Sequence, residues 1–390
     1  MRIALVLHAH QPPTQYPEVT SSIAQKSYIP IFESLTQAPK DKKITINLTR
    51  SLIDQLYELR FDTLLDKISQ VYNSNNVELT TTSAYHALVP HLTEGEISRQ
   101  VRLQNEALSQ IVGEKLKPAG MFLPELRYSY DSVRQLDKSN VKWVLLDESA
   151  YPGVRVDSNE GHEMLSINRS ITKIEGTSIV AFFRDRPMSF MVAFDHTLTL
   201  SKLVEILKRH FSEEKAEYVV VAVDMETFGY HYYGNINLFN QILESDEINL
   251  VSLSDILELE LPVKVVKPHD STWGMAEEHG EERVFPRWEN PENVLHQIQW
   301  ELFNMALRFG EHKGAGPDVF DKCLHSDQFW WAGGNPCWHP GMVESGAKLM
   351  LETIKESAAA TEKDKQHAEL LVGRLVEEGL EIYGDEVINC

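Results

Sequence analysis

Cysteine is scarce in this sequence, which has three cysteines in 390 residues: Cys323, Cys337 and Cys390. No two of them form a CxxC pair, so the sequence predicts neither a zinc knuckle nor a disulfide framework. Thiols that stay reduced are typical of the cytoplasm. We therefore expect a cytoplasmic protein with free cysteines.

Long apolar runs and positive charge are lacking as well. No apolar stretch approaches the length of a membrane span, and the opening MRIALVLHAHQPP lacks the longer apolar region and cleavage site of a signal peptide. The 37 basic residues are outnumbered by 58 acidic ones, which gives a net charge of −21. Such a surface repels nucleic-acid phosphates and anionic lipid. The sequence thus predicts no nucleic-acid or membrane partner and is compatible with a neutral substrate such as a sugar; it does not indicate an oligomeric state.

Short apolar runs rich in β-branched residues recur through the first two-thirds of the chain. They are Arg2–Leu7, Ile44–Leu48, Val77–Leu79, Gly120–Leu123, Lys142–Leu146, Ile179–Phe183, Tyr218–Val223 and Asn249–Leu253. Segments with apolar residues at helical spacing separate several of them. This alternation is typical of an α/β fold with a parallel sheet inside and helices outside. Seven or eight such units predict a closed or nearly closed β/α barrel over residues 1–265.

The pattern changes in the last third of the chain. Residues 268–287 are rich in charge, glycine and proline and predict a long loop. Helical spacing returns in 293–307, 341–357 and 365–383. We therefore expect residues 266–390 to form a loop and a helical region that packs on the barrel and completes the active site.

In a β/α barrel the reactive groups lie at the carboxyl ends of the strands. The first run ends in His8 and His10, which share one face because strand residues alternate. Two histidines satisfied near a turn are the simpler reading, but an HxH at this place favours a site. Glu78, inside the third run, points to these histidines or occupies an exposed edge, and its spacing leaves both readings open.

Carboxyl groups follow two further runs directly. Glu125 comes after FLP, and Asp224 ends the uninterrupted run VVVAVD, with Glu226 two residues later. An acidic residue after a buried strand is often a helix N-cap. That reading explains poorly the second carboxylate and the nearby Tyr230 and His231.

A final cluster, HSDQFWWAGGNPCWHP, contains Asp327, Trp330 and Trp331. Tryptophans beside glycines favour a platform for the apolar faces of sugars, although one indole could instead fill the interface between barrel and helices. Trp273, in the predicted loop, joins these residues as a candidate substrate contact.

The motifs together resemble glycoside hydrolase family 57, which includes α-amylases, 4-α-glucanotransferases and branching enzymes. HAHQPP, NNVELT, FLPELR, VDMETFG and SDQFWW resemble the family's five regions and occur in its order. The third departs from the family at Phe122, where a tryptophan is usual. The resemblance implies an incomplete (β/α)7 barrel with a C-terminal helical region, and a retaining enzyme for α-1,4-glucans or malto-oligosaccharides that requires no metal or cofactor. It makes Glu125 the nucleophile and Asp224 the acid/base.

Two alternatives remain open at this point. An HxH with a later aspartate also suits a metal-dependent hydrolase, with His86, His91 and His196 as possible further ligands. A non-catalytic glucan-binding relative is the other, although both carboxyl groups are present.

Overall fold

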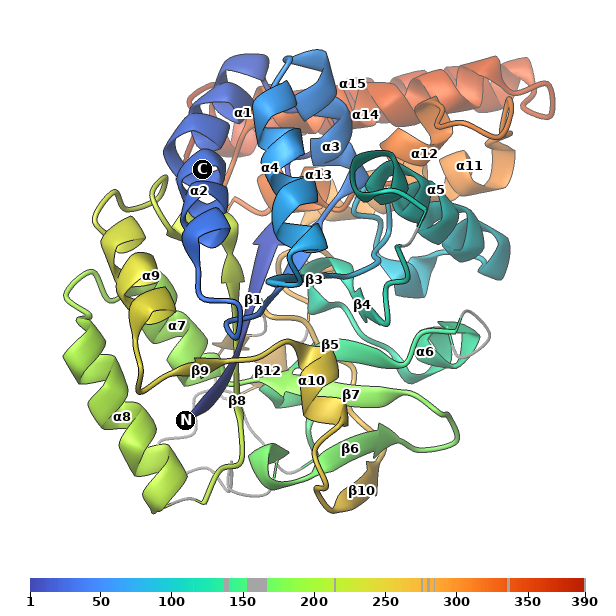
Figure 1. The fold of residues 1–390 in the computed structure, drawn as a ribbon. Coiled ribbons are helices and arrows are strands. Elements are labelled where there is room, and N and C mark those ends of the chain that lie inside the picture. The colour runs from blue at the N-terminus through green and yellow to red at the C-terminus, as the bar shows by residue number, and fades with distance from the viewer. Residues whose placement is uncertain are drawn as a thin grey trace.

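A computed structural model of the chain describes residues 1–114, 116–136, 140–152, 167–213, 215–274, 276–278, 281–283, 285–334 and 337–388. In the view of Figure 1, most of the helices lie above and to the left of the strands. The two last helices, α14 (Pro340–Glu356) and α15 (Glu362–Tyr383), lie together on one side of the strands.

Seven parallel strands of the described chain form the central barrel. They are β1 (Arg2–Ala9), β2 (Ile44–Leu48), β3 (Val77–Leu79), β4 (Gly120–Phe122), β5 (Trp143–Asp147), β7 (Val180–Arg184) and β8 (Val219–Asp224). The eighth predicted run gives the short β9 (Asn249–Leu250), which pairs with the start of β1. All eight predicted runs therefore become strands.

Two local contacts join the sheets into a barrel. Between β3 and β4, Thr81 pairs with Met121 as an isolated parallel bridge. Between β7 and β8, the amide of Asp185 donates to the carbonyl of Val220 at 2.8 Å. The strands thus run in the order β8-β1-β2-β3-β4-β5-β7, with a weak join at β7–β8, and the predicted incomplete (β/α)7 barrel is confirmed.

Two strands that the sequence did not predict extend the sheet away from the barrel. β6 (Ile171–Ile174) pairs antiparallel with β7, and β10 (Val263–Val266) pairs parallel with β6. The predicted division between residues 265 and 266 falls inside β10, so that boundary stays a prediction.

Both faces of the strands are buried, in different clusters. On β1, Ala4 and Val6 belong to the cluster inside the barrel, whereas Leu5 and Leu7 belong to the cluster under the outer helices. Because the side chains alternate, His8 faces inward. Apolar side chains dominate the lower barrel, and most of the polar ones lie at the carboxyl ends of the strands.

Helices of the first 257 residues cover the barrel. They are α1 (Pro17–Ile23), the π-helical turn η1 (Ala24–Tyr28), α2 (Ile29–Gln37), α3 (Arg50–Glu58), α4 (Asp62–Asn73), α5 (Glu94–Val112), α6 (Tyr130–Leu136), α7 (Arg186–Phe194), α8 (Leu200–Ser212), α9 (Asn235–Glu244) and α10 (Leu253–Leu257). Leu253 and Ile256 of α10 join the interior cluster, so this helix closes the floor of the barrel.

The C-terminal helices are α11 (Val294–Phe309), α12 (Val319–Cys323), α13 (Asp327–Trp331), α14 and α15. They share one apolar cluster with β4, β5 and β7, which confirms the predicted helical region. The predicted loop of residues 268–287 is partly wrong, because β11 (Ala276–Glu278) and β12 (Glu281–Arg283) pair antiparallel within it.

The structure also bears on the predicted state of the cysteines and on the expected lack of membrane-spanning segments. Cys337 is disulfide-bonded, contrary to the expectation of free thiols, whereas Cys323 is free and buried. Within the described ranges, no helix combines the length and the apolar character needed to cross a bilayer.

Candidate active site

A pocket of about 600 Å³ opens at the carboxyl ends of the barrel strands. Its wall is built from β1, the turns after β4 and β8, helix α7 and the region around α13. Of the residues predicted from the sequence, it brings together His8, His10, Glu125, Asp224, Glu226, Tyr230, His231, Trp273, Asp327, Trp330 and Trp331.

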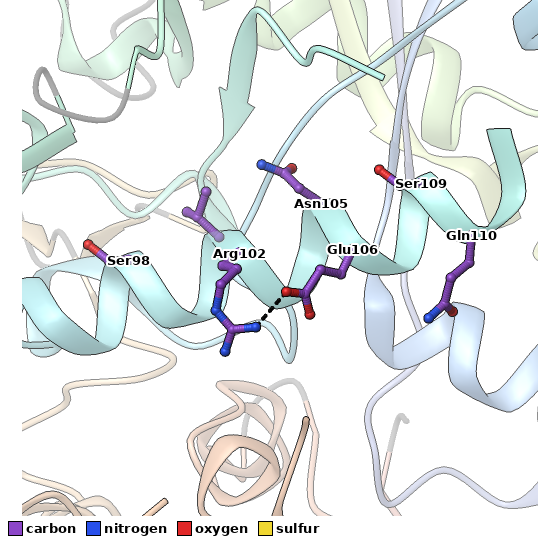
Figure 2. Close-up of a pocket in the computed structure, with 7 residues that line it drawn as sticks. Ser98, Arg102, Asn105, Glu106, Ser109 and Gln110 are labelled. Carbon is purple, nitrogen blue, oxygen red and sulfur yellow. Dashed lines mark hydrogen bonds and ion pairs between the residues drawn. The ribbon is translucent and has the colours of Figure 1, made fainter. Parts of the chain in front are cut away.

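A second hollow, of about 730 Å³, is an open groove along α5 (Figure 2). Its lining residues are Ser98, Val101, Arg102, Asn105, Glu106, Ser109 and Gln110. The guanidinium of Arg102 and the carboxylate of Glu106 pair with each other at 2.6 Å (Figure 2). The groove has neither an aromatic platform nor a second carboxylate, so we place the chemistry in the barrel pocket.

Glu125 stands in the tight turn η3 (Pro124–Leu126), directly after β4. Its backbone is left-handed, with φ 57°, and Leu126 follows with φ 48°. Residues other than glycine seldom adopt this backbone conformation, and such backbone strain persists only where the surrounding structure imposes it. The turn directs the buried Glu125 side chain into the pocket.

Three groups contact the Glu125 carboxylate. The indole Nε1 of Trp273 donates to Oε2 at 2.7 Å, and the Ser326 hydroxyl lies 3.4 Å from Oε1. The Nδ1 of His86 lies 3.7 Å from Oε1. Burial, followed by the negative charge of Asp327, raises the pKa of Glu125 to about 8, although the bond from Trp273 opposes the shift.

Asp224 reaches the pocket in a simpler way. It is the last residue of β8, with an extended backbone (φ −63°, ψ 140°), and its register partner is the inward-facing His8. Burial raises the pKa of Asp224, and the nearby positive charges of His231 and Arg184 counteract part of that increase. A buried carboxyl group that retains its proton can act as a general acid.

Glu226 lies behind Asp224 and is fixed by the N-terminal helices. The hydroxyl of Tyr28 and the amide of Gln11, the latter at 2.8 Å, both donate to Glu226 Oε1. Tyr28 ends the π-helical turn η1, a distortion that often marks functional sites. Burial, followed by the charge of Asp224, raises the pKa of Glu226 to about 8. The two carboxyl groups therefore titrate as a pair, in which ionisation of Asp224 opposes ionisation of Glu226.

The histidines divide into neutral and ion-paired groups. The Nδ1–H of His8 donates to the Oδ1 of Asn47 at 2.7 Å, and burial lowers the pKa of His8 to about 3. The Nε2 of His10 and the Nδ1 of His325 lie 3.1 and 3.2 Å from Asp327 Oδ2. Burial would raise the pKa of Asp327, but these histidines hold it well below its usual range. The pocket thus offers neutral imidazole and ionised carboxylate groups to sugar hydroxyls.

Some of these groups stand close enough to suggest a metal. The candidate ligand atoms of His10, His86 and Asp327 lie within 4.8 Å of one another. The rings of His10 and His86 are stacked, however, with centroids 4.0 Å apart and an angle of 18° between planes. Imidazole lone pairs lie in the ring plane, so stacked rings do not direct them to one ion about 2.0–2.1 Å away. The geometry suits a metal poorly.

A second cluster of possible metal ligands lies outside the pocket and consists of Glu96, His312 and Asp321. The guanidinium of Arg99 already bonds Asp321 through two atoms at 2.8 Å. This group therefore joins α5 to α12 as an ion-pair network.

Glu78 is the predicted site residue that does not line the pocket. It pairs with Thr45 in register, two residues before the Asn47 that contacts His8. Its carboxylate accepts from the Thr45 hydroxyl at 3.1 Å and from the amide and hydroxyl of Ser254 in α10. Glu78 faces the barrel interior, but one layer of side chains below the pocket. Its bonds to Ser254 hold α10 at the floor of the barrel.

The sequence reasoning missed other residues of the pocket, among them Gln11, Arg184, Phe190 and Phe194. His86, considered from the sequence only as a possible metal ligand, also lines it. Arg184 ends β7, and the rule that selected Asp224 at the end of β8 would have found it. The left-handed backbone of His86 (φ 59°) had no sequence signal.

A pair of carboxyl groups in one pocket is the arrangement that glycoside-cleaving enzymes use. Residues 4–269 match the description Glycosyl hydrolase family 57, and the chain therefore belongs to this family of glycosyl hydrolases. The family predicted from the five motifs is confirmed. No curated protein is similar enough in sequence to match.

Solved structures share the fold. The 4-α-glucanotransferase from Thermococcus litoralis has a TM-score of 0.69 at 15% identity, over 90% of this chain and 59% of that one. A branching enzyme from Thermococcus kodakaraensis has 0.66 at 14%, over 95% and 94%. An exo-type maltose-forming amylase from Pyrococcus sp. ST04 has 0.68 at 13%, over 98% and 84%. The chain thus spans little more than half of the first relative and most of the other two.

Proposed function

We propose that this protein is a retaining glycosidase or 4-α-glucanotransferase for α-1,4-glucans, with Glu125 as nucleophile and Asp224 as acid/base. The observation that carries the proposal is one pocket that holds both carboxyl groups, the buried Glu125 after β4 and the half-buried Asp224 at the end of β8. They are close enough for the charge of Asp224 to raise the pKa of Glu125.

In the first step, Glu125 attacks the anomeric carbon in its ionised form, which its pKa of about 8 makes the minor form at neutral pH, while protonated Asp224 donates to the leaving glycosidic oxygen. The bond to the leaving sugar breaks as the Glu125 ester forms. Asp224, now ionised, then takes a proton from water or from an acceptor hydroxyl, which displaces Glu125. Two inversions retain the anomeric configuration.

The remaining pocket residues bind the substrate. His8, His10 and Asp327 supply hydrogen-bond partners beside the nucleophile, and Trp330 and Trp331 supply flat apolar faces for sugar rings. Tyr230 and His231 flank the pocket on the side of Asp224. These groups suit a neutral polyhydroxyl substrate, since none requires a charged partner.

Product analysis with maltoheptaose tests the proposal. Short sugars alone mean hydrolysis, a ladder both longer and shorter than the substrate means transfer, and new α-1,6 links on amylose mean branching. We expect one of the first two patterns, unchanged by a chelator. Loss of turnover on chelation favours the metal-dependent alternative, and binding without turnover favours a non-catalytic relative.

We also propose a cytoplasmic location, which fits the acidic composition. The disulfide at Cys337 is more typical of an oxidising compartment. Cell fractionation decides between the two, and recovery outside the cytoplasm would overturn the proposal.

A further inference from the structure

Trp273 lies on a segment that runs antiparallel to the turn carrying Glu125. The amide of Tyr128 donates to the carbonyl of Ser271 at 3.0 Å, and the reverse bond is 3.3 Å. The amide of Trp273 then donates to the carbonyl of Glu125 at 3.1 Å. Three backbone hydrogen bonds therefore join the segment between β10 and β11 to the turn that carries Glu125 and the residues after it.

The same residue also holds the side chain. The indole Nε1 of Trp273 donates to Glu125 Oε2 at 2.7 Å. One residue thus fixes both the left-handed backbone and the carboxylate of Glu125. A contact with the substrate, the role predicted for Trp273 from the sequence, requires neither bond.

Trp273 is itself held from behind. Arg184 and Arg186 donate to its carbonyl at 3.3 and 3.4 Å, and the guanidinium of Arg184 lies 5.5 Å from its ring centroid. Both arginines pair with the fully buried Asp147, at 2.6 and 3.4 Å. The carboxylate at the end of β5 thus connects, through two guanidinium groups, to the indole beside the nucleophile.

We propose that Trp273 is a positioning residue for Glu125, which orients the carboxylate for attack, and that Arg184, Arg186 and Asp147 hold Trp273 in place. The inference rests on the proposed function, because it assumes that Glu125 is the nucleophile. Donation from the indole favours the ionised form that attacks, so its loss raises the pKa of Glu125.

Trp273→Phe removes the indole donor and retains an aromatic ring. We expect kcat on maltoheptaose to fall about 10- to 100-fold, the effect of losing a hydrogen bond to a charged group, with KM nearly unchanged. The acidic limb of the kcat/KM profile should move to higher pH by about 1 to 2 units. Trp273→His, which restores an N–H donor, should recover part of both changes.

Trp331→Phe is the matched control, because Trp331 also lines the pocket and, in the part of the chain that the structure describes, makes no hydrogen bond to Glu125. It should raise KM and leave the acidic limb in place. If Trp273→Phe raises KM and leaves kcat and the limb unchanged, Trp273 is a sugar platform only. If Trp273→Phe does not fold, Arg186→Gln should give a smaller shift of the limb in the same direction, and an unmoved limb overturns the proposal.

Failure of this inference can be told apart from failure of the function. An active wild type, an inactive Glu125→Gln and an unaltered Trp273→Phe would refute the positioning role alone. An active Glu125→Gln would refute the assignment of the nucleophile and the inference with it.

Discussion

The two sides of the pocket are built differently. On one side, Glu125 sits in a left-handed turn and is held by groups from the loops around residues 86, 273 and 326. On the other, Asp224 ends an extended strand, in register with His8. Its neighbour Glu226, rather than Asp224 itself, takes the bonds from Tyr28 and Gln11.

This difference indicates how each group is controlled. The position of Asp224 follows from the pairing of β8 with β1, so the backbone of the sheet suffices to present it. The position of Glu125 depends on side-chain contacts from the loops around residues 86, 273 and 326, which are distant in the sequence. Substitutions in those loops should therefore change the reactivity of Glu125.

The largest expected effect separates the roles of the two sides. Glu125→Gln should lower turnover of both maltoheptaose and α-maltosyl fluoride by at least about 1000-fold, because both substrates need the nucleophile. Asp224→Asn should lower turnover of maltoheptaose about 10²- to 10⁴-fold, as expected for a lost general acid. It should retain formation of the glycosyl-enzyme from the fluoride, since fluoride leaves without a proton.

Steady-state and burst kinetics on the two substrates measure this difference. Glu244→Gln, an exposed residue of α9, is the control and should match the wild type. Equal losses on both substrates for Asp224→Asn would contradict the division of roles.

The same contrast explains what could be predicted from the sequence. A strand leaves a clear signal, so the eight runs and the inward-facing His8 and Asp224 were found from apolar pattern and alternation. Glu125 also followed a run, but its partner Trp273 was assigned to the sugar because a contact between residues 148 positions apart has no local signal.

Glu78 shows the opposite limit. Its strand was identifiable, but its direction was left open, and its height in the barrel depends on the register of β3 against β2. Register is set by pairing across the sheet, so one sequence position does not reveal it. The antiparallel β6 and the hairpin of β11 and β12 were missed for a related reason, because they add to the barrel without belonging to the β/α alternation.

Glu148, on the nucleophile side, is a third glutamate with a raised pKa, after Glu125 and Glu226. We expect its substitution to have an effect of intermediate size, and on stability. Burial, followed by the charges of Asp185 and Asp147, raises the pKa of Glu148 to about 8, and its carboxylate accepts from the amide of Arg186 at 3.1 Å. The native state keeps this proton up to about pH 8, whereas the unfolded chain loses it near pH 4.5. The stabilisation is therefore present below pH 4.5 and is lost as the pH rises to about 8.

Glu148→Gln cannot ionise and should reduce this pH dependence. Between pH 5 and 8, we expect the fall in Tm to be smaller than in the wild type by about 2 °C or more. Differential scanning calorimetry across this range measures it, with the exposed Glu213→Gln as the control. A fall in Tm identical to that of the wild type would mean that Glu148 is ionised in the native protein.

The smallest expected effect concerns the rim of the pocket, next to the arginines of the nucleophile side. Phe194, at the end of α7, lines the pocket and is 69% exposed, and its ring packs edge-on to Phe190 at 5.7 Å. An exposed ring at a pocket rim suits a sugar unit distant from the bond that breaks. Phe194→Ala should raise KM for maltoheptaose about 3- to 10-fold, the value of one aromatic contact, and leave kcat unchanged. Maltotriose, too short to reach the rim, should be unaffected.

Tyr233→Ala is the control, because Tyr233 is 80% exposed and does not line the pocket. Equal effects of Phe194→Ala on both sugars would place Phe194 beside the reacting bond, and the nucleophile side would then extend further along α7 than the contacts of Glu125 indicate.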